Sequence, residues 1–168
     1  MTKLKGEWAI NHAINNWLRK YHFKARVRGL DTDFFWYHSS NTIGYSFAQT
    51  EESSSQWELL LSELGLKYEL SGFWTSLLHE LGHSITWSSF TDEEIDEYDE
   101  MKELLQKEDE SSFAENVHSI YFRLPIELAA TQWAVEFINT RPEAVEELTK
   151  MVAPKIQRFY KLNKITDN

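Results

Sequence analysis

The chain has 168 residues, a formal net charge of −10 and no cysteine. This length favours a single domain spanning residues 1–168, and the lack of cysteine excludes a thiol nucleophile, a disulfide scaffold and cysteine-ligated zinc. No apolar run approaches the length of a membrane span, and the N-terminal residues lack the apolar core of a signal peptide. We therefore expect a cytoplasmic protein, in a bacterium or a host cell, with no membrane partner.

The charge is unevenly distributed along the chain. Residues 1–30 carry seven Lys or Arg and one acid, a charge of +6, whereas residues 31–168 carry ten basic and twenty-six acidic residues, a charge of −16. A basic N-terminal arm is typical of proteins that bind nucleic acid. The acidic remainder argues against general DNA binding, so nucleic acid is the minor alternative among the partners we expect.

The first third of the chain predicts one helix followed by a small sheet. Apolar residues recur at helical spacing over residues 7–22, and residues 23–30 then alternate between apolar and basic. Two further strands, at residues 33–38 and 42–48, are predicted to form a hairpin. The expected sheet has three antiparallel strands, which makes the chain an α+β protein with a mainly helical C-terminal half.

The remaining two thirds predict helices with recognisable start and stop signals. The serines at 53–55 are predicted to cap a helix that ends before Gly65, Ser71 to cap the next helix, and Pro125 to open a later one. A last helix is expected to break or kink near Pro154. Capping boxes, in which Ser or Thr is followed three residues later by Glu, predict three more helix starts: Thr91 with Glu94, Ser112 with Glu115, and Thr140 with Glu143.

The segment from Phe73 to Thr86 contains the pattern H-E-x-x-H, formed by His79, Glu80 and His83. Residues four apart lie on the same side of a helix, so the two histidines can bind one metal ion together. Glu80 lies beside them, where a carboxylate can act as a general base. The alternative interpretation is a helix with two surface histidines and a solvated glutamate.

A catalytic zinc needs a third protein ligand and an open position for water. We choose Glu127, because Ala130 and Ala134 on the same predicted helix give it a small-residue face that can pack closely against the histidine helix. The alternative role for Glu127 is to stabilise the N-terminus of its helix through the helix dipole. Glu103 and His118 are the competing ligand candidates.

The mechanism that this site predicts is zinc-assisted hydrolysis of a peptide bond, with Glu80 as the base. The developing oxyanion usually needs a hydrogen-bond donor as well. Tyr121, His118 and Tyr98 are the candidates for this donor, and the sequence does not choose among them.

The segment 73–84, followed by Glu-Leu-Ala-Ala at residues 127–130 and by residues 133–138, resembles the zincin-type metallopeptidase domain of ArdC-like antirestriction proteins. It is similar, more loosely, to the ImmA/IrrE peptidases. The resemblance implies zinc at His79, His83 and Glu127, Glu80 as the base, and a phage or mobile-element origin. It covers the two motif helices and little of residues 1–70. ArdC-like chains often have another acid where this chain has Thr131.

Our leading hypothesis is therefore an intracellular zinc metallopeptidase that acts on a protein or peptide, with a small sheet over its H-E-x-x-H helix. The alternative is an antirestriction or regulatory protein with a structural zinc, which would engage DNA or a DNA-bound protein through the N-terminal arm. The arm residues that would carry this role are Arg19, Lys20, Arg26 and Arg28. A degenerate zincin scaffold is a third alternative, against which the intact His, Glu and His argue.

Overall fold

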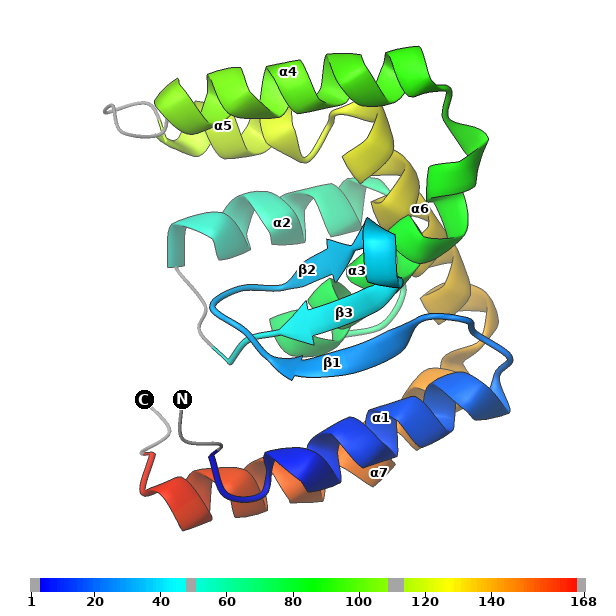
Figure 1. Ribbon diagram of the computed structural model, residues 1–168, viewed down its shortest axis with the longest axis vertical. Coiled ribbons are helices and arrows are strands. Elements are labelled where there is room, and N and C mark those ends of the chain that lie inside the picture. The colour runs from blue at the N-terminus through cyan, green and yellow to red at the C-terminus, as the bar shows by residue number, and fades with distance from the viewer. Residues whose placement is uncertain (1–3, 48–50, 109–113, 166–168) are drawn as a thin grey trace. The chain divides into compact units, whose positions relative to one another are not determined.

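The computed structural model describes residues 4–47, 51–108 and 114–165, and within them it has seven α-helices and three short strands (Figure 1). The α+β class is therefore confirmed. The elements in chain order are α1 (Glu7–Lys20), β1 (Arg26–Leu30), β2 (Phe35–Tyr37), β3 (Thr42–Tyr45), α2 (Glu51–Glu63), α3 (Gly72–Thr86), α4 (Asp92–Glu108), α5 (Ala114–Tyr121), α6 (Pro125–Thr140) and α7 (Pro142–Asn163). Two single-turn 3-10 helices, His38–Ser40 and Trp87–Ser89, follow β2 and α3.

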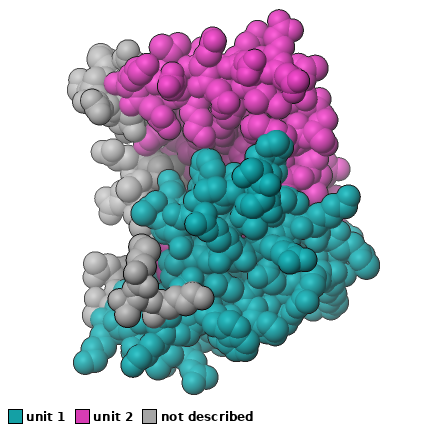
Figure 2. Space-filling view, in the orientation of Figure 1, with its two compact units in different colours: residues 1–46, 141–168 teal, residues 47–140 magenta. Residues whose placement is uncertain are grey.

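The chain forms two compact units (Figure 2). Unit 1 comprises residues 1–46 and 141–168 and contains α1, the three strands and α7. Unit 2 comprises residues 47–140 and contains α2 to α6. The prediction of a single domain stays a prediction, as does the placement of the sheet over the H-E-x-x-H helix.

In unit 1, the first and last helices lie side by side and run in opposite directions (Figure 1). The indole of Trp17 donates to the carbonyl oxygen of Ala144 over 2.8 Å, which joins the end of α1 to the start of α7. At the opposite ends, the side chain of Asn163 accepts from the backbone of Lys5 and donates back to it. Helix α7 continues through Pro154, so the chain does not break there, and the predicted alternative of a kink stays a prediction.

The three strands of unit 1 form a mixed sheet in the order β1-β3-β2, so the predicted antiparallel sheet is only partly right. The hairpin of β2 and β3 is antiparallel as expected, but β1 pairs with β3 in parallel. Strand β3 ends at Tyr45, so the predicted extension over Ser46 and Phe47 is wrong, and residue 48 lies outside the described residues. Strand direction depends on contacts distant in sequence, which alternation of side chains along one strand does not encode.

The outer edge of β1 is already occupied by side chains of α1. The amide of Asn15 both accepts from the backbone N–H of Val27 and donates to its carbonyl, and Glu7 accepts from the backbone N–H of Leu30. Gly29 lies between them, where a Cβ would come within 2.6 Å of the Glu7 carboxylate. These contacts satisfy the backbone groups that an added strand would need, so this edge is closed to strand addition.

The helix starts of unit 2 follow the predicted signals in part. Thr91 and Glu94 form a reciprocal capping box at α4, as predicted. The box at Ser112 lies outside the described residues, and α2 begins before the serines that were expected to cap it. The Ser71 backbone accepts from Trp74 at the start of α3, but its hydroxyl makes no cap bond.

The third capping box, predicted at the junction between α6 and α7, is wrong. Thr140 remains in the last turn of α6 and donates to the carbonyl of Glu136, while Glu143 pairs with Arg141 instead. The hydroxyl is therefore used within the preceding helix, a local bond that competes with capping.

Helices α3 and α6 approach each other very closely in unit 2. A Cβ added at Gly82 would lie 2.4 Å from the carbonyl oxygen of Ala130, closer than any side chain can be accommodated without a backbone shift. Glycine on one helix and alanine on the other therefore bring the two backbones together, as the small-residue face at Ala130 predicted. None of the described helices is long and apolar enough to cross a membrane.

Candidate metal centre

Helix α3 buries the whole H-E-x-x-H pattern. The exposed fractions of His79, Glu80 and His83 are 6%, 9% and 6%. The interpretation of a solvated helix surface is therefore wrong for these three side chains. Burying imidazole and carboxylate groups is costly unless partners compensate for the lost water. The contacts of these side chains thus decide what the site can do.

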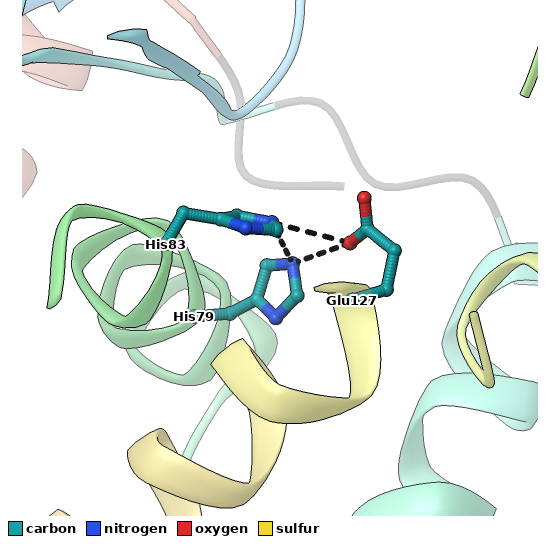
Figure 3. Close-up of side chains that lie close together, drawn as sticks. All are labelled: His79, His83 and Glu127. Carbon is teal, nitrogen blue, oxygen red and sulfur yellow. Dashed lines mark hydrogen bonds and ion pairs between the residues drawn. The ribbon is translucent and has the colours of Figure 1, made fainter. Parts of the chain in front are cut away.

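Glu127 meets the two histidines from the first turn of α6 and is only 1% exposed (Figure 3). Its Oε2 atom lies 3.0 Å from His79 Nε2 and 3.2 Å from His83 Nε2, and the two Nε2 atoms lie 3.1 Å apart. Three potential ligand atoms thus form a triangle. The close approach of α6 at Gly82 brings Glu127 within this distance of α3.

A neighbouring hydroxyl fixes which nitrogen of His79 carries the proton. Thr131 donates its only hydroxyl proton to the carbonyl of Glu127 over 2.8 Å, and the same oxygen lies 3.1 Å from His79 Nδ1. The hydroxyl therefore accepts from Nδ1–H. In the neutral imidazole, this leaves Nε2 with a lone pair directed at the triangle, which is the form that binds a metal.

The triangle is poorly satisfied by hydrogen bonds alone. In neutral His79, the Nε2 lone pair faces the carboxylate oxygen of Glu127, and both atoms are acceptors. A proton on His83 Nε2 can be directed well at only one of these two acceptors, either His79 Nε2 or Glu127 Oε2. One cation facing all three atoms would satisfy every contact at once.

The charges in the triangle also favour a cation. Burial raises the pKa of Glu127, but the adjacent imidazoles of His79 and His83 outweigh it and hold the pKa well below the usual range. Burial lowers the pKa of His83, but its hydrogen bond to Glu127 and the nearby carboxylates raise it overall. The carboxylate is thus ionised and attracts positive charge.

The spacing of the triangle fits a metal ion. A tetrahedral ion with bonds of about 2.0 Å would separate its ligands by about 3.3 Å, and an octahedral ion with bonds of about 2.1 Å would separate them by about 3.0 Å. The three observed separations, 3.0, 3.1 and 3.2 Å, lie between these values. His79, His83 and Glu127 therefore form a buried group that can hold a metal ion, and zinc and ferrous iron both use such a donor set.

The second oxygen of Glu127 has its own partners. The hydroxyls of Tyr98 and Tyr121 both donate to Oε1, the latter over 2.6 Å. Burial and the neighbouring Glu127 charge raise the pKa of both phenols, so both remain protonated donors at neutral pH. Two of the three predicted transition-state donors, Tyr98 and Tyr121, thus donate to a candidate metal ligand, Glu127.

Glu80 lies on the metal side of the histidines, with Oε1 3.9 Å from His79 Nε2. The competing ligand candidates are not part of the group. Glu103 is exposed and forms an ion pair with Lys107, and His118 lies against the ring of Phe122. The structure therefore brings together the predicted His, His and Glu set and leaves the other two candidates outside it.

Sequence reasoning missed two residues that fix His79. It noted Thr131 only as a missing acid, although a hydroxyl one turn after Glu127 can reach a neighbouring helix. The ring of Trp57 also packs edge-on against the His79 ring at 5.1 Å, while its indole N–H donates to Thr75. Trp57 forms a hydrophobic cluster with Leu61 and Val135, so the cluster supports the imidazole from the side.

No model of a known protein family, no curated protein and no solved structure matches this chain. The residues and the geometry of this site therefore carry the functional proposal.

Proposed function

We propose that this protein is an intracellular zinc metallopeptidase, a zincin related to ArdC-like proteins, in which His79, His83 and Glu127 hold the ion. The observation that carries the proposal is the triangle of two imidazole nitrogens and one carboxylate oxygen with a further carboxylate, Glu80, 3.9 Å from one of the nitrogens. The resemblance of the two motif helices to zincin-type domains supports it.

Zinc bound at such a site lowers the pKa of water to about 7 and polarises a carbonyl group. Glu80 would take the proton from the attacking water at Oε1 and pass it to the leaving amine. The His79 ring is held in the ligating tautomer by Thr131, and the burial of the group would keep bulk water away from it.

The adjacent carboxylate is also what favours hydrolysis over oxidation. Two histidines and one carboxylate are equally the ligand set of non-haem iron oxygenases. Hydrolysis requires a base beside the metal, and Glu80 supplies one from the turn of α3 that lies between the two histidines. We therefore favour the peptidase.

The test is the rate of peptide cleavage by native protein and by Glu80→Gln, followed by mass spectrometry on a mixture of short unstructured peptides. We expect Glu80→Gln to keep its zinc and to lose roughly 100-fold to 10,000-fold in rate. The matched control, Glu136→Gln, changes an exposed glutamate of α6 and should cleave normally. A zinc-loaded native protein that cleaves none of the peptides, or a Glu80→Gln variant as fast as native, would argue against the proposal.

A second candidate function is supported by the basic strand β1. Arg26 and Arg28 are exposed on the same face of this strand, and in this alternative they bind DNA or a DNA-bound protein while zinc is structural. Binding to a DNA duplex that weakens steeply with salt, and is lost when both arginines become alanine, would favour this function.

A further inference from the structure

Three helices of unit 2 converge on the outer oxygen of Glu127. Tyr98 comes from the middle of α4, Tyr121 is the last residue of α5, and Glu127 lies in the first turn of α6. Both phenol hydroxyls donate to Oε1, while Oε2 faces the two histidines. The two oxygens of one carboxylate therefore have entirely different partners.

The protons available to Oε1 are fully assigned. A phenol has a single hydroxyl proton, and the structure directs both of these protons at the same carboxylate oxygen. The contact between the two phenol oxygens is long, at 3.5 Å, and does not compete. Charge-assisted hydrogen bonds of this kind are stronger than those between neutral groups, so Oε1 is held away from the histidines.

The Tyr98 ring is itself fixed in place. It is 8% exposed, it packs edge-on against Trp87, and the ammonium of Lys102 lies over its face at 5.5 Å. A side chain that must turn toward a substrate oxyanion needs freedom to move, whereas one that orients a ligand needs to be held. These contacts favour the second role.

We infer that Tyr98 and Tyr121 are positioning residues that restrict Glu127 to one-oxygen coordination and so keep one position on the metal open. The inference rests on the metal site proposed above. A carboxylate can bind a metal through one oxygen or both. If Oε1 were released, it would occupy the position that a catalytic site keeps for water.

The experiment loads native protein, Tyr98→Phe, Tyr121→Phe and the double variant with Co²⁺, whose visible absorption reports its coordination number. We expect the double variant to show weaker bands, typical of a higher coordination number, and each single variant an intermediate change. Zinc affinity, measured by competition with a chromogenic chelator, should fall roughly 10-fold to 100-fold in the double variant because Glu127 is no longer oriented.

Tyr45→Phe is the matched control. Tyr45 in unit 1 is 0% exposed and donates to Asn11 over 2.8 Å, so the variant loses a comparable hydrogen bond that involves none of the metal-ligand residues. Its Co²⁺ spectrum and zinc affinity should equal those of native protein. Because each single variant removes only one hydroxyl, the singles give the answer if the double variant does not fold.

Two results would overturn the inference, and they differ from failure of the proposed function. If native protein binds Co²⁺ and the tyrosine variants give its spectrum and affinity unchanged, the hydroxyls do not control coordination. If the spectrum and affinity are unchanged and only the turnover number for peptide cleavage falls, the two tyrosine hydroxyls act as oxyanion donors instead. A native protein that binds neither Co²⁺ nor zinc would instead remove the metal site, and with it the function proposed above.

Discussion

The two units differ in how many polar side chains they bury. Among the described residues, six of the seven buried polar or charged side chains belong to unit 2, and the only one in unit 1 is Ser46. The six are Thr75, His79, Glu80, His83, Glu127 and Thr131. In unit 1, charged groups pair at the surface, as Lys20 does with Glu147 at 2.5 Å.

This difference indicates that unit 2 contains the candidate site, whereas unit 1 serves as scaffold. Apolar burial stabilises a fold without specific partners, and exposed ion pairs add little. Buried charges cost stability unless they are paired, and replacing such a group by apolar residues is often neutral or stabilising. The concentration of buried ionisable groups in unit 2 is therefore poorly explained by stability and well explained by metal binding.

The largest expected effect is that of zinc on stability. At a free concentration about a thousand times its dissociation constant, zinc should stabilise native protein by about 4 kcal/mol over protein treated with chelator. His83→Ala should abolish this gain, whereas His12→Ala, an exposed histidine of unit 1 stacked on Trp8, should keep it. Thermal unfolding with and without zinc measures the gain. Equal stabilisation of both variants would mean that zinc binds elsewhere.

Gly82→Ala tests the close approach of α3 and α6. Helix propensity alone predicts that alanine stabilises the helix by about 1 kcal/mol. The contact with the Ala130 carbonyl predicts the opposite sign, a net loss of about 1 to 3 kcal/mol, because the helices must separate. Urea unfolding gives the sign directly. A stabilised variant with unchanged zinc affinity would refute the close contact.

Thr131→Val should act on the metal without removing a ligand. The variant keeps the shape of threonine but offers no acceptor to His79 Nδ1, so zinc affinity should fall roughly 10-fold to 100-fold. Thr131→Ser should restore most of it. Thr149→Val is the matched control, because that hydroxyl donates only to a carbonyl within α7. A Thr131→Val variant with native affinity would show that the hydroxyl does not set the tautomer.

Glu147→Gln in unit 1 should have the smallest effect. Hydrogen bonds from Lys20 and Tyr21 hold the pKa of Glu147 below its usual value, so the stabilisation is present at neutral pH and is lost as the pH falls through that lowered pKa. The small difference in melting temperature between variant and native protein should therefore vanish in acid. Zinc affinity should not change. A difference that grows in acid would contradict the assignment.

The residues of the candidate metal group were predictable because their signals are local. The spacing of His79 and His83 places them on one helix face whatever the rest of the chain does. Glu127 could be preferred over Glu103 because the small residues after it predict a close helix contact, whereas the acids around Glu103 indicate a solvated face. The structure agrees with both interpretations.

The features that the sequence did not reveal depend on contacts between distant residues. The parallel pairing of β1 with β3 and the meeting of Tyr98 with Tyr121 at one carboxylate oxygen are set by packing. The sequence allowed both tyrosines to be recognised as hydrogen-bond donors, but it did not reveal that their acceptor is Glu127. Thr140 shows the same limit at short range, because its hydroxyl had two local acceptors and the motif predicted the wrong one.

The most direct test of the metal centre is the metal content of native protein, His79→Ala and Glu127→Ala, measured for zinc and iron by mass spectrometry. We predict about one zinc per native chain, none in His79→Ala, and weakened binding in Glu127→Ala. One iron per chain in place of zinc would contradict the zinc assignment. A native chain that contains no metal, and takes up none when zinc is added, would contradict the metal centre itself.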